Sequence, residues 1–347
     1  MKFSRLRLKI VQHWAKIACF LLGAVFGGGI FLLLFPFQEK AVDESLKKGK
    51  DFQVRQKGNY QFISPLIECE IENAEVSKKY IPFEKKTKEL IAKEIIEKNP
   101  NIHLAIYFRN LNNGPWFGIN ERENFTPASM LKVVLMMSFF KLSESDSSLL
   151  SKEVRFDRLN DSLGLVQNFK PKEQIAVGNK YTIEELIRRM IVFSDNQAME
   201  LLLKNIDEKQ ISRIYLDLGI EVPGLRNADD FMSVKEYASF FRILYNASYL
   251  NHQNSEKALE LLAQVDYKNG IMKKLPSEIV VAHKFGEREF EENGKVVRQL
   301  HDCGVVYYEK YPYLLCVMTR GAEWDKLSAI VNDTSKIIFD EIKKNFP

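Results

Sequence analysis

The chain has 347 residues, 46% of them hydrophobic and 28% charged, and a formal net charge of +4. This composition is typical of a globular protein that is long enough to bury a core, and it offers no strongly basic surface for nucleic acid. The five histidines and four cysteines show no metal-ligand spacing, so we expect neither a metal nor any other cofactor.

The N-terminus combines basic residues with a long apolar run. Residues 1–16 carry five lysines and arginines, and the next 21 residues, 17–37, read "IACFLLGAVFGGGIFLLLFPF" without a charge. An apolar helix of this length spans a bilayer, and the basic flank predicts a cytoplasmic N-terminus. A cleaved signal peptide is the alternative, but its apolar region is usually shorter and no small-x-small cleavage site follows. We therefore expect a single-pass anchor in the cell membrane with the rest of the chain outside the cytoplasm.

The oligomeric state is expected to be monomeric. Gly23 and Gly27 have the GxxxG spacing that can pack one membrane helix against another. Glycine is common in membrane spans, so this spacing alone gives only a weak indication of a dimer.

Residues 38–84 are charged and irregular and include "KAVDESLKKGKDFQVRQKG". We interpret them as a stalk that holds a folded domain, 85–347, away from the membrane. Beyond the span lie Cys69, Cys303 and Cys316. Because three cysteines leave one over, we expect buried free thiols rather than a disulfide framework.

The folded domain has strand patterns at both ends and helical patterns in the middle. Turn signals at Asn112-Asn113-Gly114 and Asn293-Gly294 predict two hairpins. The expected elements are a helix at 84–99, strands at 103–111 and 115–121, a helix at 126–141, a helical region at about 142–266, strands at 278–287, 295–310 and 313–321, and a C-terminal helix. This order predicts an α+β fold, in which one sheet is assembled from both chain ends around a helical insertion.

The helix "TPASMLKVVLMMSFFK" (126–141) is almost wholly apolar but carries Ser129 and Lys132 near its start. Thr126 is expected to cap the helix, with Pro127 at its first position. Ser129 then lies in the first turn, where free N–H groups and the helix dipole favour a developing negative charge. Because the two residues are three apart, their side chains share one face of the helix.

Two other copies of Ser-x-x-Lys lack this setting. Ser45–Lys48 lies in the stalk, where a solvated lysine keeps its ordinary pKa, and Ser138–Lys141 begins more than two turns into the helix. Such a short pattern gains meaning only from its structural context.

Two further polar clusters follow in the sequence. Ser194-Asp195-Asn196 interrupts an apolar helical pattern, and Lys284-Phe285-Gly286 lies on a predicted strand. Taken singly, the first is an ordinary helix cap or turn and the second an ordinary strand with a surface lysine. Together with Ser129-x-x-Lys132, in this order, they resemble the Ser-x-x-Lys, Ser-Asp-Asn and Lys-Thr-Gly motifs of penicilloyl-serine transferases. The resemblance covers about residues 84–347 and is closest to class A β-lactamases, which implies a β-lactamase/transpeptidase-like fold with an all-helical lobe.

The resemblance also implies catalytic roles. Ser129 would be the nucleophile that attacks a β-lactam or a D-alanyl-D-alanine-type carbonyl, and Lys132 would be its base. Ser194 would relay the proton to the leaving nitrogen.

Four residues would bind the substrate, by the same resemblance. Asn196 would hydrogen-bond the side-chain amide of the substrate, and Lys284 would attract its carboxylate. Gly286 precedes Glu287, whose backbone N–H, with that of Ser129, would form the oxyanion hole.

The sequence departs from the family at the third motif, where Phe285 replaces the threonine. A hydroxyl that would help to bind the substrate carboxylate is therefore absent. Arg288, Arg298 and His301 are the nearby residues that can replace it, although each also fits surface or strand-edge structure.

The second departure is the Glu-x-x-Leu-Asn segment, whose glutamate activates the deacylating water in class A enzymes. The corresponding stretch, "LGIEVPGLRNADDFMSVKEY", contains no such segment. Its carboxylates are Glu221, Asp229 and Asp230, of which the last two are expected to cap the next helix.

Three functions remain open from the sequence. The first is a membrane-anchored class A-like β-lactamase with slow deacylation. The second is a penicillin-binding-protein-like peptidase that acts on cell-wall peptides, and the third is a non-catalytic binding protein. The intact set Ser129, Lys132, Ser194 and Asn196 argues against the third.

Overall fold

The structure is a computed structural model and describes residues 53–56, 58–69, 81–158, 167–220, 222, 230–309 and 311–347. The predicted membrane span at 17–37 and the Ser45–Lys48 copy of the motif lie outside these residues. Within the described ranges, no helix is both long enough and apolar enough to cross a membrane.

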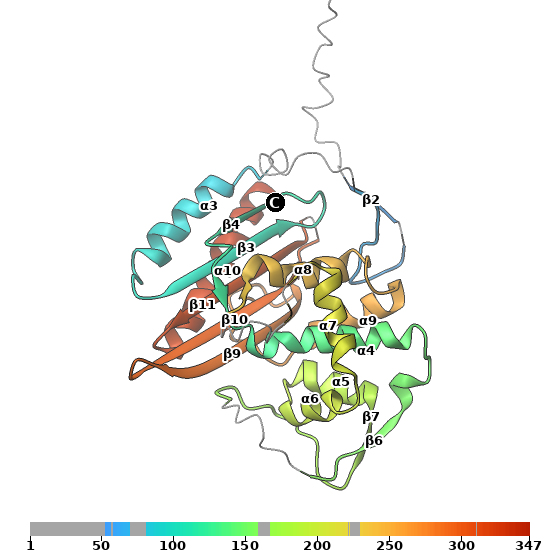
Figure 1. Cartoon of the computed structure of the whole chain (residues 1–347). Coiled ribbons are helices and arrows are strands. Elements are labelled where there is room, and N and C mark those ends of the chain that lie inside the picture. Colours follow the sequence, from blue (N-terminus) through green and yellow to red (C-terminus); the bar gives the residue numbers. More distant parts are fainter. Residues whose placement is uncertain are drawn as a thin grey trace, which may run out of the picture. The chain divides into compact units, whose positions relative to one another are not determined.

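One five-stranded antiparallel sheet organises the domain, in the order β4-β3-β11-β10-β9 (Figure 1). Strands from the two ends of the sequence therefore lie side by side, which confirms the predicted α+β fold. The strands are β3 (His103–Asn110), β4 (Trp116–Ile119), β9 (Val280–Glu292), β10 (Lys295–Tyr307) and β11 (Tyr313–Gly321).

The hairpin between β9 and β10 turns at Asn293 and Gly294. Both residues have positive φ values, 51° and 73°. A two-residue loop with this conformation matches the right-handed twist of the two strands, and asparagine and glycine adopt it at low cost. The predicted turn is confirmed.

Helices cover both faces of the sheet (Figure 1). Side chains alternate along β3, so Leu104 and Ile106 pack in one apolar cluster, with α3 (Glu84–Ile91) and α10 (Trp324–Asn345). Ala105 and Tyr107 belong to the other cluster, which includes most of the helical lobe.

The helical lobe is built around α4 (Lys132–Ser143), in which every residue from Lys132 to Phe140 is buried. Such a helix is apolar on all sides because it runs through the core. The other helices of the lobe are α5 (Ile183–Val192), α6 (Asn196–Leu203), α7 (Glu208–Asp217), α8 (Val234–Tyr245) and α9 (His252–Ala263). Two small sheets pair β5 (Asn124–Phe125) with β8 (Met232–Ser233) and β6 (Glu153–Arg155) with β7 (Lys180–Thr182).

The expected stalk is partly structured, and here the sequence interpretation was wrong. β1 (Gln53–Arg55) and β2 (Leu66–Cys69) form a small antiparallel sheet. Between them Phe62 and Ile63 are buried, and their backbone N–H groups donate to the carboxylate of Glu256 on α9 at 2.9–3.1 Å. A short apolar stretch within a charged segment therefore packs onto the lobe, because it can bury side chains there.

Cys303 and Cys316 face each other on β10 and β11 and are joined by a disulfide. We had expected free thiols. The antiparallel register places the two residues directly opposite each other, which spacing along the sequence does not reveal.

Candidate active site

The head of α4 differs from the predicted cap. A 3-10 turn, η3 (Ala128–Leu131), precedes the helix, and its N-cap is Pro127, without a side-chain cap bond. Since a 3-10 turn has about three residues, Ser129 lies on the same face as Lys132, one turn away. Ala128 has a φ of 51°, and this left-handed conformation determines the direction in which the chain enters the turn. Ser129 is half-buried and its hydroxyl makes no hydrogen bond with the residues that the structure describes.

Lys132 is buried, with 1% of its surface exposed, although it is a lysine. Its Nζ atom lies 2.7 Å from the Ser194 carbonyl oxygen, 3.1 Å from the Ser194 Oγ atom and 2.7 Å from the Asn196 Oδ1 atom. Burial, and then the charge of Lys284, hold the pKa of Lys132 well below its usual range. A lysine in this state can accept a proton from a nearby hydroxyl.

Ser194 and Asp195 lie between α5 and α6, and Asn196 is the first residue of α6. Ser194 adopts a left-handed backbone, with φ at 58°, which is uncommon for residues other than glycine. Asp195 caps α6: its Oδ1 atom accepts the N–H of Gln197 at 2.8 Å, while its Oδ2 atom accepts that of Ile175 at 2.9 Å. This turn directs both oxygens of Ser194 to Lys132.

Lys284 comes from β9 and is fully buried. Its Nζ atom lies 3.1 Å from the Ser194 Oγ atom and 4.1 Å from the centroid of the Phe285 ring. Burial lowers the pKa of Lys284 to about 7, although the charges of Asp302 and Glu287 oppose this change. The structure thus brings Lys284 into the site. Attraction of a substrate carboxylate would require an exposed amine, however, and Lys284 is buried.

Gly286 lets β9 approach the head of α4. A Cβ atom at this position would lie 2.3 Å from the Pro127 carbonyl oxygen and 2.9 Å from a carbon of the Met130 side chain. Only glycine permits this approach without displacement. The third motif therefore fixes the strand beside the turn that carries Ser129.

The sequence analysis did not predict two features of β9. The Phe285 ring is buried and stacks on Tyr267 at 4.1 Å, with the Phe169 ring against it at 5.2 Å. The half-buried Glu287 carboxylate accepts the Phe169 N–H at 2.8 Å. Strand alternation could have placed both side chains on one side, but nothing in the sequence identified Phe169 as their partner.

The Glu287 carboxyl has a perturbed pKa. Burial raises it, whereas the N–H groups of Phe169 and Asn168 and the charges of Lys284 and Lys132 act in the opposite direction. An acidic group thus lies within electrostatic reach of both lysines.

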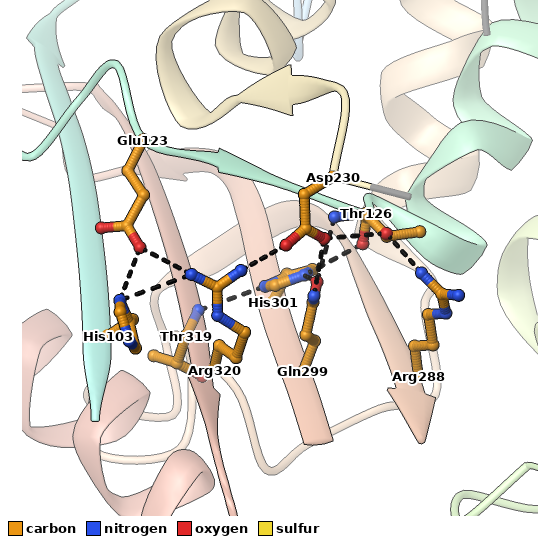
Figure 2. A network of polar contacts seen from close by, with 9 residues as sticks. All are labelled: His103, Glu123, Thr126, Asp230, Arg288, Gln299, His301, Thr319 and Arg320. Atoms are coloured by element: carbon orange, nitrogen blue, oxygen red, sulfur yellow. Dashed lines mark hydrogen bonds and ion pairs between the residues drawn. The ribbon is translucent and has the colours of Figure 1, made fainter. Parts of the chain in front are cut away.

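A polar network supports Thr126, three residues before Ser129 (Figure 2). The Thr126 hydroxyl donates to Asp230 at 3.0 Å and accepts from Arg288 at 2.7 Å. Asp230 also accepts from Gln299 at 2.8 Å and pairs with Arg320. Asp230 was expected to cap the next helix, but Ser233 caps α8, in a capping box with Glu236.

His301 lies in the same network and is fully buried (Figure 2). Its Nδ1 atom accepts the Thr319 N–H at 3.2 Å, so its Nε2 atom carries the proton and donates to the Thr126 carbonyl oxygen at 3.1 Å. Burial lowers the pKa of His301 to about 4, so the ring is neutral near pH 7.

The residues that were expected to compensate for the missing threonine hydroxyl have other partners. Arg288 bonds Thr126, and His301 is enclosed. Arg298 pairs with Glu289 at 2.7 Å. Of the other carboxylates considered, Glu221 and Asp229 lie outside the described residues.

The third copy of the Ser-x-x-Lys motif is structural. Ser138 is buried and its hydroxyl donates to the Val134 carbonyl oxygen at 2.9 Å, one turn back. Lys141 is exposed and pairs with Glu144 at 2.8 Å. The two side chains therefore have separate roles, as the context of this copy predicted.

Known proteins resemble this chain in sequence profile and in fold. The sequence profile of the β-lactamase enzyme family matches residues 83–342. A search of curated proteins by sequence found no match.

Several solved structures have the same fold. The structure of PBP-A is 17% identical, with a TM-score of 0.61, over 75% of this chain and 96% of that chain. A mutant of PBP-A in an acyl-enzyme complex with penicillin G has a TM-score of 0.62 at 17% identity, over 75% and 97% of the two chains. A class A β-lactamase from Mycobacterium abscessus has a TM-score of 0.61 at 17% identity, over 74% and 99%.

Proposed function

The chain belongs to the β-lactamase enzyme family, and we propose that Ser129 is the nucleophile of a serine hydrolase that β-lactams acylate. The observation that carries this proposal is the convergence of three motifs. Lys132 and Lys284 both contact the Ser194 hydroxyl, and Lys132 lies one 3-10 turn from Ser129.

In the proposed acylation, the Ser129 Oγ atom forms a bond to the lactam carbonyl carbon. Neutral Lys132 takes the hydroxyl proton, and the carbon–nitrogen bond of the lactam breaks. Lys132 then returns the proton through the Ser194 hydroxyl to the lactam nitrogen, so that no net proton is gained. The contacts of Lys132 with Ser194 support this route.

The negative oxygen of the intermediate is proposed to lie between the N–H groups of Ser129 and Glu287. The close approach of Gly286 to Pro127 supports this placement, since it brings β9 to the turn that carries Ser129. One such donor is commonly worth about 3 kcal/mol of transition-state stabilisation.

Deacylation is proposed to be slow. A general base that activates water contributes roughly a hundredfold to ten-thousandfold in rate. The sequence lacks Glu-x-x-Leu-Asn in the corresponding stretch, and Asp230 is already bonded to Thr126, Gln299 and Arg320. The acyl-enzyme should therefore persist.

The second candidate is a penicillin-binding-protein-like peptidase that acts on D-alanyl-D-alanine-type cell-wall peptides. It uses the same nucleophile and needs no class A glutamate. The likeness in fold to PBP-A, as well as to class A β-lactamases, favours keeping this candidate.

One experiment separates these candidates. The full-length protein is incubated with benzylpenicillin and its mass is followed over time, while hydrolysis of benzylpenicillin and of a D-alanyl-D-alanine peptide is measured in parallel. A persistent adduct with slow hydrolysis supports the proposal, and cleavage of a D-alanyl-D-alanine peptide would favour the peptidase. Turnover at tens per second without an adduct would contradict slow deacylation.

The chain is also proposed to be anchored in the membrane by residues 17–37, with the domain outside. The 21 uncharged residues behind a basic flank support this proposal. Protease added to intact cells should remove the domain and leave a short membrane-bound fragment. A mature soluble form that starts near Gln38 would instead reveal a cleaved signal peptide.

A further inference from the structure

Glu287 places a carboxylate where recognition of a substrate carboxylate would be expected. It follows Gly286 directly, so its side chain extends from the residue whose N–H is proposed to bind the oxyanion. Because side chains two apart on a strand point the same way, Glu287 and Phe285 share one side of β9. Phe169 contacts both, through its N–H and through its ring.

Among the described residues of the third motif, the groups expected to hold a substrate carboxylate are missing or already bonded. Phe285 offers no hydroxyl, and its ring is packed between Tyr267 and Phe169. Lys284 is fully buried, with its Nζ atom bonded to the Ser194 hydroxyl at 3.1 Å and the Phe285 carbonyl oxygen at 3.2 Å. Glu287 is half-buried, and its carboxylate is held by backbone N–H groups, including that of Phe169 at 2.8 Å, rather than by a cation.

We propose that Glu287 is a specificity-determining residue that makes the site select acyl donors with a cationic group beside the scissile bond and discriminate against donors with a carboxylate there. This inference rests on the proposed function of Ser129. A partly buried carboxylate repels a negative group of the substrate within several ångströms and attracts a positive one. Both effects therefore raise the ratio of the acylation rate with a cationic donor to that with an anionic donor.

The test compares three donors built on one penicillin nucleus. Benzylpenicillin carries a carboxylate, its methyl ester is neutral, and its choline ester carries a permanent positive charge. The acylation rate constant of the full-length protein is measured for each by intact mass. The expected order is cationic, neutral, anionic, with a span of at least about tenfold between the first and the last.

Glu287→Gln removes the charge but keeps an oxygen that can accept the Phe169 N–H. In this variant, the ratio of cationic to anionic acylation should fall about tenfold. Glu289→Gln is the matched control, because Glu289 is an exposed residue of the same strand that pairs with Arg298. It should leave the ratio unchanged.

Two outcomes would contradict the inference, and they differ in what they imply. If the wild-type protein reacts fastest with benzylpenicillin, and Glu287→Gln keeps that order, the inference fails while the proposed function stands. If none of the three donors modifies Ser129, the proposed function fails and the inference with it. The wild-type order alone decides the matter if the variant does not fold.

Discussion

The side-chain amines of Lys132 and Lys284 converge on the Ser194 hydroxyl, each with 3.1 Å between its Nζ atom and the Oγ atom. Burial lowers the pKa of both amines, and the charge of Lys284 lowers that of Lys132 further. The arrangement therefore prepares a neutral lysine beside Ser129 at a pH where a solvated lysine would carry a proton.

The pH dependence of acylation should reveal this neutral lysine. If Lys132 is the base, the rate rises with pH through the pKa of Lys132 and is constant above it. An ordinary lysine, with a pKa of about 10.4, would give a tenfold rise per pH unit up to about pH 10. We expect the plateau at a much lower pH, in rates measured by intact mass with a neutral donor. Lys132→Arg should abolish acylation at every pH, because arginine does not release its proton.

Substitutions of Ser194 should separate its effect on stability from its effect on activity. Its φ of 58° costs about 1 kcal/mol for a residue with a Cβ atom, and glycine avoids this cost. Ser194→Gly should be more stable than Ser194→Ala by about 1 kcal/mol in urea unfolding. Both variants lose the hydroxyl and should acylate slowly. Equal stability of the two would show that the left-handed backbone is not under strain.

Gly286→Ala should displace the turn that carries Ser129, because the new Cβ atom would meet the Pro127 carbonyl oxygen at 2.3 Å. A displacement of about 1 Å can cost roughly a hundredfold in rate, and we expect a loss of that size in acylation. Gly321→Ala is the control: its Cβ atom would lie 3.1 Å from Ile102, at the end of β11. If both variants acylate equally fast, the role given to Gly286 is wrong.

His301 should make stability depend on pH below neutrality. Its folded pKa of about 4 lies below the unfolded value of 6.5, so between these values the unfolded state binds a proton that the folded state does not. Stability is then full above about pH 6.5 and falls towards pH 4, by up to roughly 3 kcal/mol, since the two pKa values differ by about 2.5. Unfolding in urea across this range should show the loss, and His301→Gln should reduce it. An unchanged slope in the variant would exclude His301 as its source.

The motifs and the sheet could be predicted because their signals are local. Apolar periodicity and turn residues such as Asn293-Gly294 fix the elements, and the order of Ser129, Ser194 and Lys284 along the chain indicates the family. In the structure, Ser129 lies at the head of α4, Ser194 lies between α5 and α6, and Lys284 lies on β9.

Contacts between distant segments could not be predicted in the same way. Phe169 meets Glu287 across 118 positions, and Asp230 meets Thr126 across 104. Each residue alone fits a loop or a helix cap, and only the packed sheet and lobe bring the partners together. The disulfide between Cys303 and Cys316 likewise depends on strand register.

The most direct test of the account is the site at which a penicillin attaches to the protein. Full-length wild-type protein, Ser129→Ala and Ser138→Ala are each incubated with benzylpenicillin, and the modified peptide is identified by mass spectrometry. Because the Ser138 hydroxyl is bonded within α4, Ser138→Ala should be labelled like the wild type, on Ser129. Ser129→Ala should remain unlabelled. An adduct that persists in Ser129→Ala, or that maps to another residue of the wild type, would contradict the assignment of the nucleophile.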